Sequence, residues 1–300
     1  PIPSCEKAPS VQILNSGIDS NYLNVGWNID TSHVSYIVAY GPLGYDPILA
    51  PAGGDTVTSS SNFKSITGLQ PLSDYCIWVK AICTNGDTSF WSGPFCGETG
   101  CPSSTGVPYF EDFTSYTTSE VPLCWQEAQG ALGGGSAGVP ISYGTSFWAP
   151  DGFANVGTNG SAKINIYSTN RFEWIVSPSI NLGSDPNQTF IIEFDIAMTD
   201  YANTTAGVVG YDDSLAFVVS YDDGLTWSQS NIIESWDTSN VPSNTGDHFY
   251  HILRNKTGVV KFGFYATTTV SNEDNDWFID NFSIKDTVFV GLNEVAEMAN

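Results

Sequence analysis

Positive charge is scarce in this sequence. Lysine and arginine contribute 9 residues against 32 aspartates and glutamates, so the formal net charge is −23 at pH 7. Clustered lysine and arginine side chains are needed to bind phosphates, which makes nucleic acid and anionic membranes poor partners. The surplus of acids favours divalent cations as partners and a salty medium that screens self-repulsion. It is equally typical of a chain that is merely very soluble.

Several motifs are absent as well. No apolar run is long enough for a transmembrane helix, which needs roughly 20 residues, so membrane insertion is not expected. The chain begins at Pro1 without a signal peptide, and we expect a mature or excised piece of a longer exported protein. CxxC pairs, HExxH and histidine clusters do not occur. Zinc is therefore not expected, and the six cysteines indicate disulfides formed in an oxidising, extracellular compartment.

Methionine is rare, with 2 residues, whereas aromatic residues make up 13% of the chain and glycine contributes 29 residues. This balance suits short strands joined by tight turns better than helices. A length of 300 residues exceeds the usual size of one domain. We therefore predict an all-β protein of two domains with almost no helix.

Residues 8 to 99 alternate with the period of a β-strand. Turn-forming stretches separate the alternating segments, a pattern typical of a β-sandwich. The apolar positions are Val11 and Ile13; Leu23, Val25 and Trp27; Tyr36, Val38 and Tyr40; and Tyr75, Ile77, Val79 and Ala81. The position of Trp27 is that of a large central core residue.

A tyrosine corner is predicted in the string GLQPLSDY, where Leu69 precedes Tyr75. In this arrangement the ring packs and the hydroxyl caps the backbone at a strand crossover. With the string YCIWVKAICTNGDTSFWSGPF, residues 1–100 resemble fibronectin type III domains of bacterial secreted proteins. The resemblance implies a spacer module without catalytic residues. His33 stands alone in a turn and is expected to be solvated.

The cysteines of this module can be paired by register. If CIWVKAIC and the strand ending at Cys96 form a hairpin around NGD, positions that sum to about 172 face each other. Cys76 then faces Cys96 at a distance that suits a disulfide. Cys83 is left to bond Cys5. Four cysteines allow three pairings, so the other pairings remain open.

A second unit begins at Cys101. Its landmarks, in order, are YFEDFTSYTTSEVPLCWQEA, WIVSPSINL, DSLAFVVSYDDGLTW, KFGFY and WFIDNFSI. They resemble those of the MAM-like, cleaved-adhesin jelly rolls of Bacteroidetes surface proteins. The resemblance implies a jelly-roll β-sandwich over residues 101–286, larger than the first module, and a disulfide between Cys101 and Cys124.

Residues 287–300 lose the strand alternation and contain the string GLNE. This string resembles the linker that leads into the sorting domain of proteins exported by type IX secretion. The resemblance implies a parent protein that crosses the outer membrane and is either anchored to the cell surface or released.

Calcium is the cofactor that the second resemblance implies. Jelly rolls of this kind commonly hold a structural Ca²⁺ where the first strand meets the last, and Ca²⁺ prefers about six to eight oxygen ligands. The matching acids are Glu111, Asp112 and Asp280, with Asp213 as a further candidate. Thr114 stands where a second acid is often found, which removes one potential ligand. The alternative is that these acids only line turns and solvated edges.

The string SYDDGLTW, ending at Trp227, matches the Asp-box pattern of sialidases. The pattern is a hairpin device in which a carboxylate accepts backbone N–H bonds and the tryptophan packs beneath it. A sialidase also needs an arginine triad, whereas this chain has only Arg171 and Arg254. His248 and His251 are expected on opposite faces of a strand, where they cannot share a metal. We predict no enzymatic activity in this segment.

Loop aromatics can stack on sugars, and Trp148 and Trp236 are the candidate ligand-binding residues, although a strand can equally bury them. The leading hypothesis is a non-catalytic, secreted or cell-surface adhesion module that binds a glycan or a protein. One alternative is an accessory region of a secreted protease or glycosidase whose catalytic domain lies outside this chain. Another is a structural, self-assembling subunit of an extracellular assembly.

Overall fold

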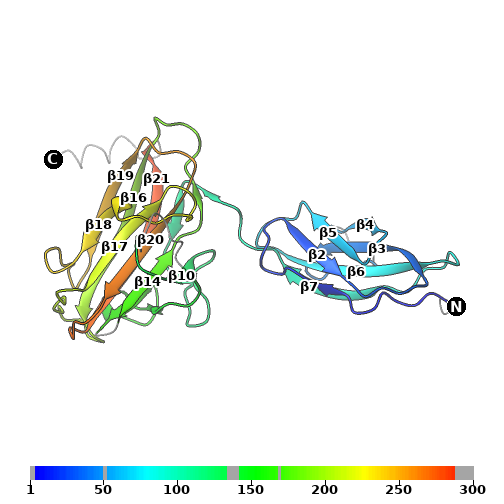
Figure 1. Ribbon diagram of the computed structural model, residues 1–300, viewed down its shortest axis with the longest axis horizontal. Coiled ribbons are helices and arrows are strands. Elements are labelled where there is room, and N and C mark those ends of the chain that lie inside the picture. Colours follow the sequence, from blue (N-terminus) through cyan, green and yellow to red (C-terminus); the bar gives the residue numbers. More distant parts are fainter. Residues whose placement is uncertain (1–3, 50–52, 134–141, 168–169, 288–300) are drawn as a thin grey trace. The chain divides into compact units, whose positions relative to one another are not determined.

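The computed structural model describes residues 4–49, 53–133, 142–167 and 170–287, and it is almost entirely β-structure (Figure 1). Helix within these ranges is limited to two 3-10 turns of 3 residues each, η1 (Phe153–Asn155) and η2 (Gln229–Asn231). The all-β fold predicted from the composition is confirmed. The chain divides into two compact units, Pro1–Ser103 and Ser104–Asn300.

The first unit is a sandwich of two antiparallel sheets. One sheet has the strand order β1 (Gln12–Ile13), β2 (Tyr22–Gly26) and β5 (Phe63–Thr67). The other has the order β4 (Asp55–Ser59), β3 (His33–Pro42), β6 (Asp74–Cys83) and β7 (Ser92–Glu98). The alternating apolar residues of both sheets form one core, which includes Leu23, Val25, Trp27, Val38, Ile77 and Val79.

Two disulfides cross-link this unit. Cys76 pairs with Cys96 across β6 and β7, with their Cα atoms 4.1 Å apart. Such a close approach is typical of a non-hydrogen-bonded antiparallel pair. Cys5 bonds Cys83, with a Cα separation of 5.7 Å. The hairpin register predicted the first pair, and the second is the pairing that was left for Cys83.

The tyrosine corner is also present. The hydroxyl of Tyr75 accepts a hydrogen bond from the Gln70 backbone N–H at 3.0 Å. Leu69 is buried in the core of the same unit. Cys101 and Cys124 are disulfide-bonded as well, and no described cysteine is free.

The second unit is a larger sandwich. One sheet has the strand order β11 (Ser142–Tyr143), β10 (Gln126–Gln129), β14 (Arg171–Val176), β20 (Val259–Thr268), β15 (Ile180–Asn181) and β8 (Thr105–Gly106). In the same sheet, β17 (Ser214–Ser220) pairs with β20 and also with β18 (Ile232–Trp236). The other runs β12 (Trp148–Asp151), β13 (Ser161–Ile166), β21 (Asn275–Asp286), β16 (Thr189–Asp200) and β19 (Asp247–Arg254), with β9 (Tyr109–Glu111) beside β21. All pairings are antiparallel except β15 with β8.

Strand alternation builds the core between these two sheets. Along β16 every second side chain faces inward, namely Phe190, Ile192, Phe194, Ile196 and Met198. They meet the inward residues of the opposite sheet, including Phe217 on β17 and Phe264 on β20. Phe194 lies with its ring centroid 4.9 Å from each of these two rings. The centre of this core is therefore aromatic.

Among the described residues, no helix is both long enough and apolar enough to cross a membrane. The predicted linker at 287–300 lies outside the described residues except for Thr287.

Candidate functional site

The acids expected to bind calcium gather around β9 and β21 in the second unit. Strand β9 lies beside β21, with Glu111 opposite Phe282, and Asp112 follows directly. Asp280 on β21 lies opposite Asp195 on β16. A β-bulge in the β16–β21 ladder, between Glu193 and Asp195, accompanies the left-handed Asn281. We call Glu111, Asp112 and Asp280 the acid cluster.

Burial and mutual repulsion shape the electrostatics of the acid cluster. The pKa of Asp280 is raised to about 6, chiefly by burial and to a lesser extent by the charges of Asp195 and Asp112, against the opposing effect of the hydrogen bond from the Asn281 N–H. Burial likewise raises the pKa of Glu111, with smaller contributions from Asp112 and Asp280. No lysine or arginine within the described ranges forms an ion pair with the three acids. A bound cation would relieve this repulsion.

Not all of the cluster's oxygens are free for a ligand. Asp112 accepts hydrogen bonds from the Thr114 hydroxyl at 2.7 Å and its N–H at 3.0 Å, which lowers the pKa of Asp112. Glu111 accepts the Phe113 N–H at 2.7 Å. The donor set, made of carboxylates beside a bulged strand, fits a hard cation. It does not form a closed cage, because the three carboxylates do not come within 4.8 Å of one another.

Asp213 is not part of the acid cluster. It precedes β17, is 2% exposed, and accepts the Gly210 N–H at 3.0 Å. Its acidic neighbours are Asp212 and Glu273, which add to the effect of burial in raising its pKa. Asp213 is therefore held by a different loop from the acid cluster, and its role as a metal ligand stays a prediction.

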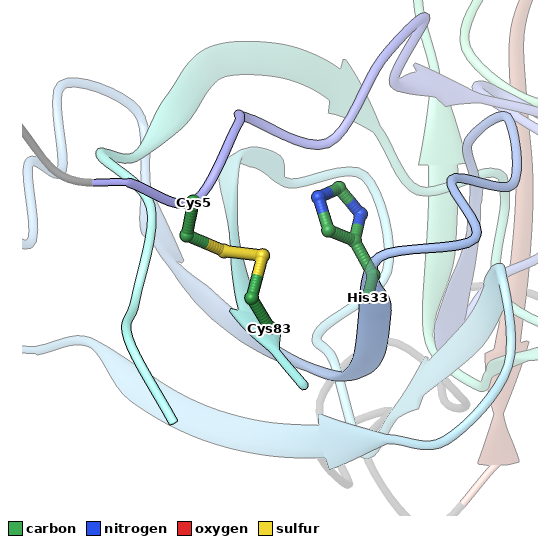
Figure 2. A group of neighbouring side chains, drawn as sticks. All are labelled: Cys5, His33 and Cys83. Carbon is green, nitrogen blue, oxygen red and sulfur yellow. A yellow bond between two sulfur atoms is a disulfide. The ribbon is translucent and has the colours of Figure 1, made fainter. Parts of the chain in front are cut away.

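One group of three metal-ligating side chains does converge within the described residues, in the first unit. Figure 2 shows the His33 ring beside the disulfide of Cys5 and Cys83, and their donor atoms lie within 4.8 Å of one another. The sulfurs are bonded to each other, so they offer no thiolate to a metal. His33 Nδ1 is 3.3 Å from the Tyr36 hydroxyl, and its Nε2 is buried without a hydrogen-bond partner. The expected solvated histidine is instead partly buried.

The two tryptophans proposed as sugar platforms are buried, which corrects that prediction. Trp148 on β12 is 4% exposed, because its pairing with Ile164 turns it toward the core. Trp236 on β18 is 5% exposed and packs against Phe194 and Phe249. Neither ring can stack on a ligand in solvent.

The Asp-box forms the expected turn. The Asp222 carboxylate accepts hydrogen bonds from the Thr226 N–H at 2.9 Å, the Thr226 hydroxyl at 2.6 Å and the Ser220 hydroxyl at 2.7 Å. Trp227 is buried against Trp174, with ring centroids 5.1 Å apart. These contacts occupy the carboxylate in holding the hairpin.

The remaining candidates for chemistry are also separated or occupied. His248 pairs with Asp195 on the outer face of β16, whereas His251 pairs with the core residue Ile192, so the two histidines face opposite sides. Arg171 donates to the Asn165 carbonyl at 2.6 Å and lies over the Phe147 ring, so its guanidinium is already engaged.

A pocket that no sequence motif indicated lies where loops of the second unit meet. Its volume is 500 Å³. The lining residues are Phe153, Ala154, Val156, Thr204, Asn244 and Thr245. We call it the loop pocket. None of its lining side chains is ionisable, and they combine apolar side chains with hydroxyl and amide groups.

Hydrogen bonds hold the loop pocket in shape. The Asn155 amide donates to the Thr199 hydroxyl, the Asn203 carbonyl and the Asp276 carboxylate at 2.8, 2.8 and 3.1 Å. The Asn244 amide donates to the Thr204 carbonyl at 2.8 Å. Three non-glycine residues nearby, Ala154, Asn155 and Ala202, have a left-handed backbone. Strain of this kind is often found at binding sites.

Comparison with known proteins gives the following. No family model matches the chain, and no curated protein is similar to it. Among solved structures, the chain is similar to the K3 cleaved adhesin domain of Lys-gingipain from Porphyromonas gingivalis W83, at 13% identity and a TM-score of 0.32, covering 57% of this chain and 96% of that one.

Two further solved structures are similar to parts of the chain. One is the fn3 domain of the human collagen alpha-1(XX) chain, at 22% identity and a TM-score of 0.28, covering 34% of this chain and 92% of that one. The other is the C-terminal CBM6 of LamC from Zobellia galactanivorans, at 14% identity and a TM-score of 0.28, covering 54% and 98%. Similarity at this level transfers no ligand or activity.

Proposed function

We propose that the chain belongs to a secreted, non-catalytic binding protein whose second unit binds a neutral glycan in the loop pocket. The lining of this pocket is the observation that carries the proposal. Sugars present apolar ring faces beside hydroxyl groups, and small-ligand sites match them with apolar surface and a few placed polar groups. Phe153 and Val156 offer the first kind of surface, and Thr204, Asn244 and Thr245 the second.

The absence of ionisable groups from the pocket lining favours binding over catalysis. General acid–base chemistry needs a titratable side chain within hydrogen-bond reach of the substrate. A glycan is also favoured over a protein ligand, because a pocket of 500 Å³ has the size of a small-molecule site. A standard protein interface instead spreads over roughly 800 Å² per partner.

The proposal includes Ca²⁺ bound at the acid cluster, where it would stabilise the strands β9 and β21. It is supported by the raised pKa values of Glu111 and Asp280 and by the hard oxygen donors there. The disulfide-bonded cysteines support an oxidising, extracellular location. The GLNE string near the C-terminus supports export by the type IX route.

A glycan array probed with the whole chain tests the ligand. We then expect Thr245→Val to weaken binding of the selected glycan roughly tenfold, about the effect of one lost hydrogen bond. Thr118→Val, an exposed threonine outside the pocket, is the matched control and should leave affinity unchanged. Binding that is equally strong in both variants would place the ligand elsewhere.

A further inference from the structure

Polar residues replace the apolar core at one end of the second sandwich. Here β16 and β20 end and β17 and β21 begin, as the pairs Asp200 with Asn275 and Ser214 with Thr267 show. Alternation fixes which side chains face inward. Ala266 and Trp277 lie in the core, so Thr268 and Asn275, two positions along their strands, also face the space between the sheets.

Asp213 enters the same space from the loop before β17. Its neighbour two positions along, Leu215, is a core residue. Val209, earlier in this loop, packs in the core as well. The side chains of Asp213, Thr268 and Asn275 thus form an inward polar layer, which we call the polar cap.

The polar cap is buried and lacks partners. Asp213 is 2% exposed, and Thr268 and Asn275 are 0% exposed. No partner meets hydrogen-bond geometry for Asp213 Oδ1, for Thr268 Oγ1 or for either side-chain polar atom of Asn275, although the Thr268 hydroxyl lies near enough to Asp213 to oppose the rise in the pKa of that carboxyl. Buried polar atoms without partners destabilise the folded state unless a ligand satisfies them. Several such atoms together indicate a bound group.

One short loop passes against both Asn275 and Asp213. A Cβ added to Gly207 would lie 2.6 Å from Asn275 Oδ1, and one added to Gly210 would lie 2.4 Å from Asp213 Oδ2. These glycines are three positions apart, so the loop spans at most about 10 Å between them. Both glycines are needed because the oxygen atoms press against the loop backbone.

Within the described residues, the charge at the polar cap has no counter-ion. Asp212 and Glu273 are neighbouring carboxylates, and no lysine or arginine of the described chain forms an ion pair with Asp213. The oxygens of Asp212 already accept the N–H groups of Val270 and Ser271 at 2.7 and 3.1 Å, which fixes the loop before β21. A buried carboxylate needs a cation or a proton to offset its charge.

We infer that the polar cap binds a calcium ion through Asp213 Oδ1, Thr268 Oγ1 and Asn275 Oδ1, separate from the acid cluster. Carboxylate, hydroxyl and amide oxygens are hard ligands of the kind that Ca²⁺ prefers, and backbone carbonyls or water complete its shell. The ion joins the two sheets where their connecting loops cross. It also neutralises the single buried acid of the cap.

Terbium luminescence on the full chain tests this inference, with Tb³⁺ as the probe and Ca²⁺ as competitor. Asp280→Asn serves as the background, because it disables the acid cluster. Trp277 lies two positions from Asn275 on the same inward face and should sensitise a bound Tb³⁺. In this background we expect saturable emission that Ca²⁺ displaces. Adding Asp213→Asn should weaken binding roughly 100-fold or more, since a buried charge loses its partner.

Two results would overturn the inference. One is no saturable emission in the Asp280→Asn background. The other is equal affinity after Asp213→Asn, which mimics a protonated acid and so describes a cap without an ion. Thr268→Val is a second test variant that should still fold, because it keeps the side-chain volume and removes only one oxygen. We expect it to weaken Tb³⁺ roughly tenfold, whereas unchanged affinity would also count against the site.

Discussion

The two units are stabilised by different chemistry. The core of the first is mainly aliphatic, with Trp27 and Tyr36 as its large aromatic members, and two disulfides tie its strands. The second centres on stacked phenylalanines and contains the acid cluster and the polar cap. A small sandwich buries a smaller fraction of its surface, so covalent links matter more to it. Only the second unit is expected to respond to cations.

The largest effect should come from removing a disulfide of the first unit. Cys5→Ala with Cys83→Ala removes a link across a sequence separation of 78 residues. The loop-entropy relation predicts a loss of about 4.5 kcal/mol from the first unit. Calorimetry of the full chain should show one transition shifted strongly downward and the other unchanged. Removing Cys76 and Cys96, separated by 20 residues, should cost less, about 3 kcal/mol. Equal shifts in both transitions would contradict the division.

Removal of calcium should affect the stability of the second unit alone. At a free concentration of 100 times the Kd, one bound ion stabilises the folded state by about 2.7 kcal/mol. Chelation should therefore lower the transition of the second unit and leave the first in place. In Asp280→Ala the part of this response that belongs to the acid cluster should disappear. A general salt effect on a chain of charge −23 would move both transitions instead.

Much of the fold could be predicted because it depends on local alternation. Period-two patterns placed the strands, and the hairpin register placed Cys76 opposite Cys96. The same alternation does not report which face of an edge strand is covered. The sequence therefore allows Trp148 and Trp236 to be either exposed or buried. Their cross-strand partners Ile164 and Leu215 show that both tryptophans face the core.

The loop pocket and the polar cap could not be predicted from the sequence. The pocket joins residues near positions 154, 204 and 244, which only the folded sheets bring together. The left-handed backbone of Ala154 leaves no mark in a sequence, since alanine does not favour it. Asp213 carried a signal as an acid beside a strand, but its partners Thr268 and Asn275 are ordinary polar residues whose importance comes from burial.

In the absence of calcium, the stability of the second unit should depend on pH through Asp280. The pKa of Asp280 is about 6 in the folded chain, against an ordinary value of 3.8, so the folded state binds more protons. Stability of the second unit should therefore fall as pH rises from about 4 to about 6, by roughly 2 kcal/mol after allowance for solvent screening.

Denaturant unfolding in chelator at pH 4.5 and 7 measures this effect, and Asp280→Asn is the control that should flatten it. Bound Ca²⁺ favours the ionised carboxylate and should oppose the fall. A second unit that gains stability over the same pH interval in chelator would show that Asp280 is not the controlling group.

The smallest effect should come from the Asp-box turn, which lies away from both cation sites. Asp222→Ala removes three hydrogen bonds from a partly exposed turn. Because water replaces much of what is lost, we expect a cost of about 1 kcal/mol to the second unit, with the fold retained. Asp222→Asn keeps one acceptor oxygen and should cost less. Urea unfolding measures the loss, and unchanged terbium binding would show that the turn acts on the hairpin alone. A global loss of near-ultraviolet dichroism in Asp222→Ala would instead mean that the turn supports the whole aromatic core.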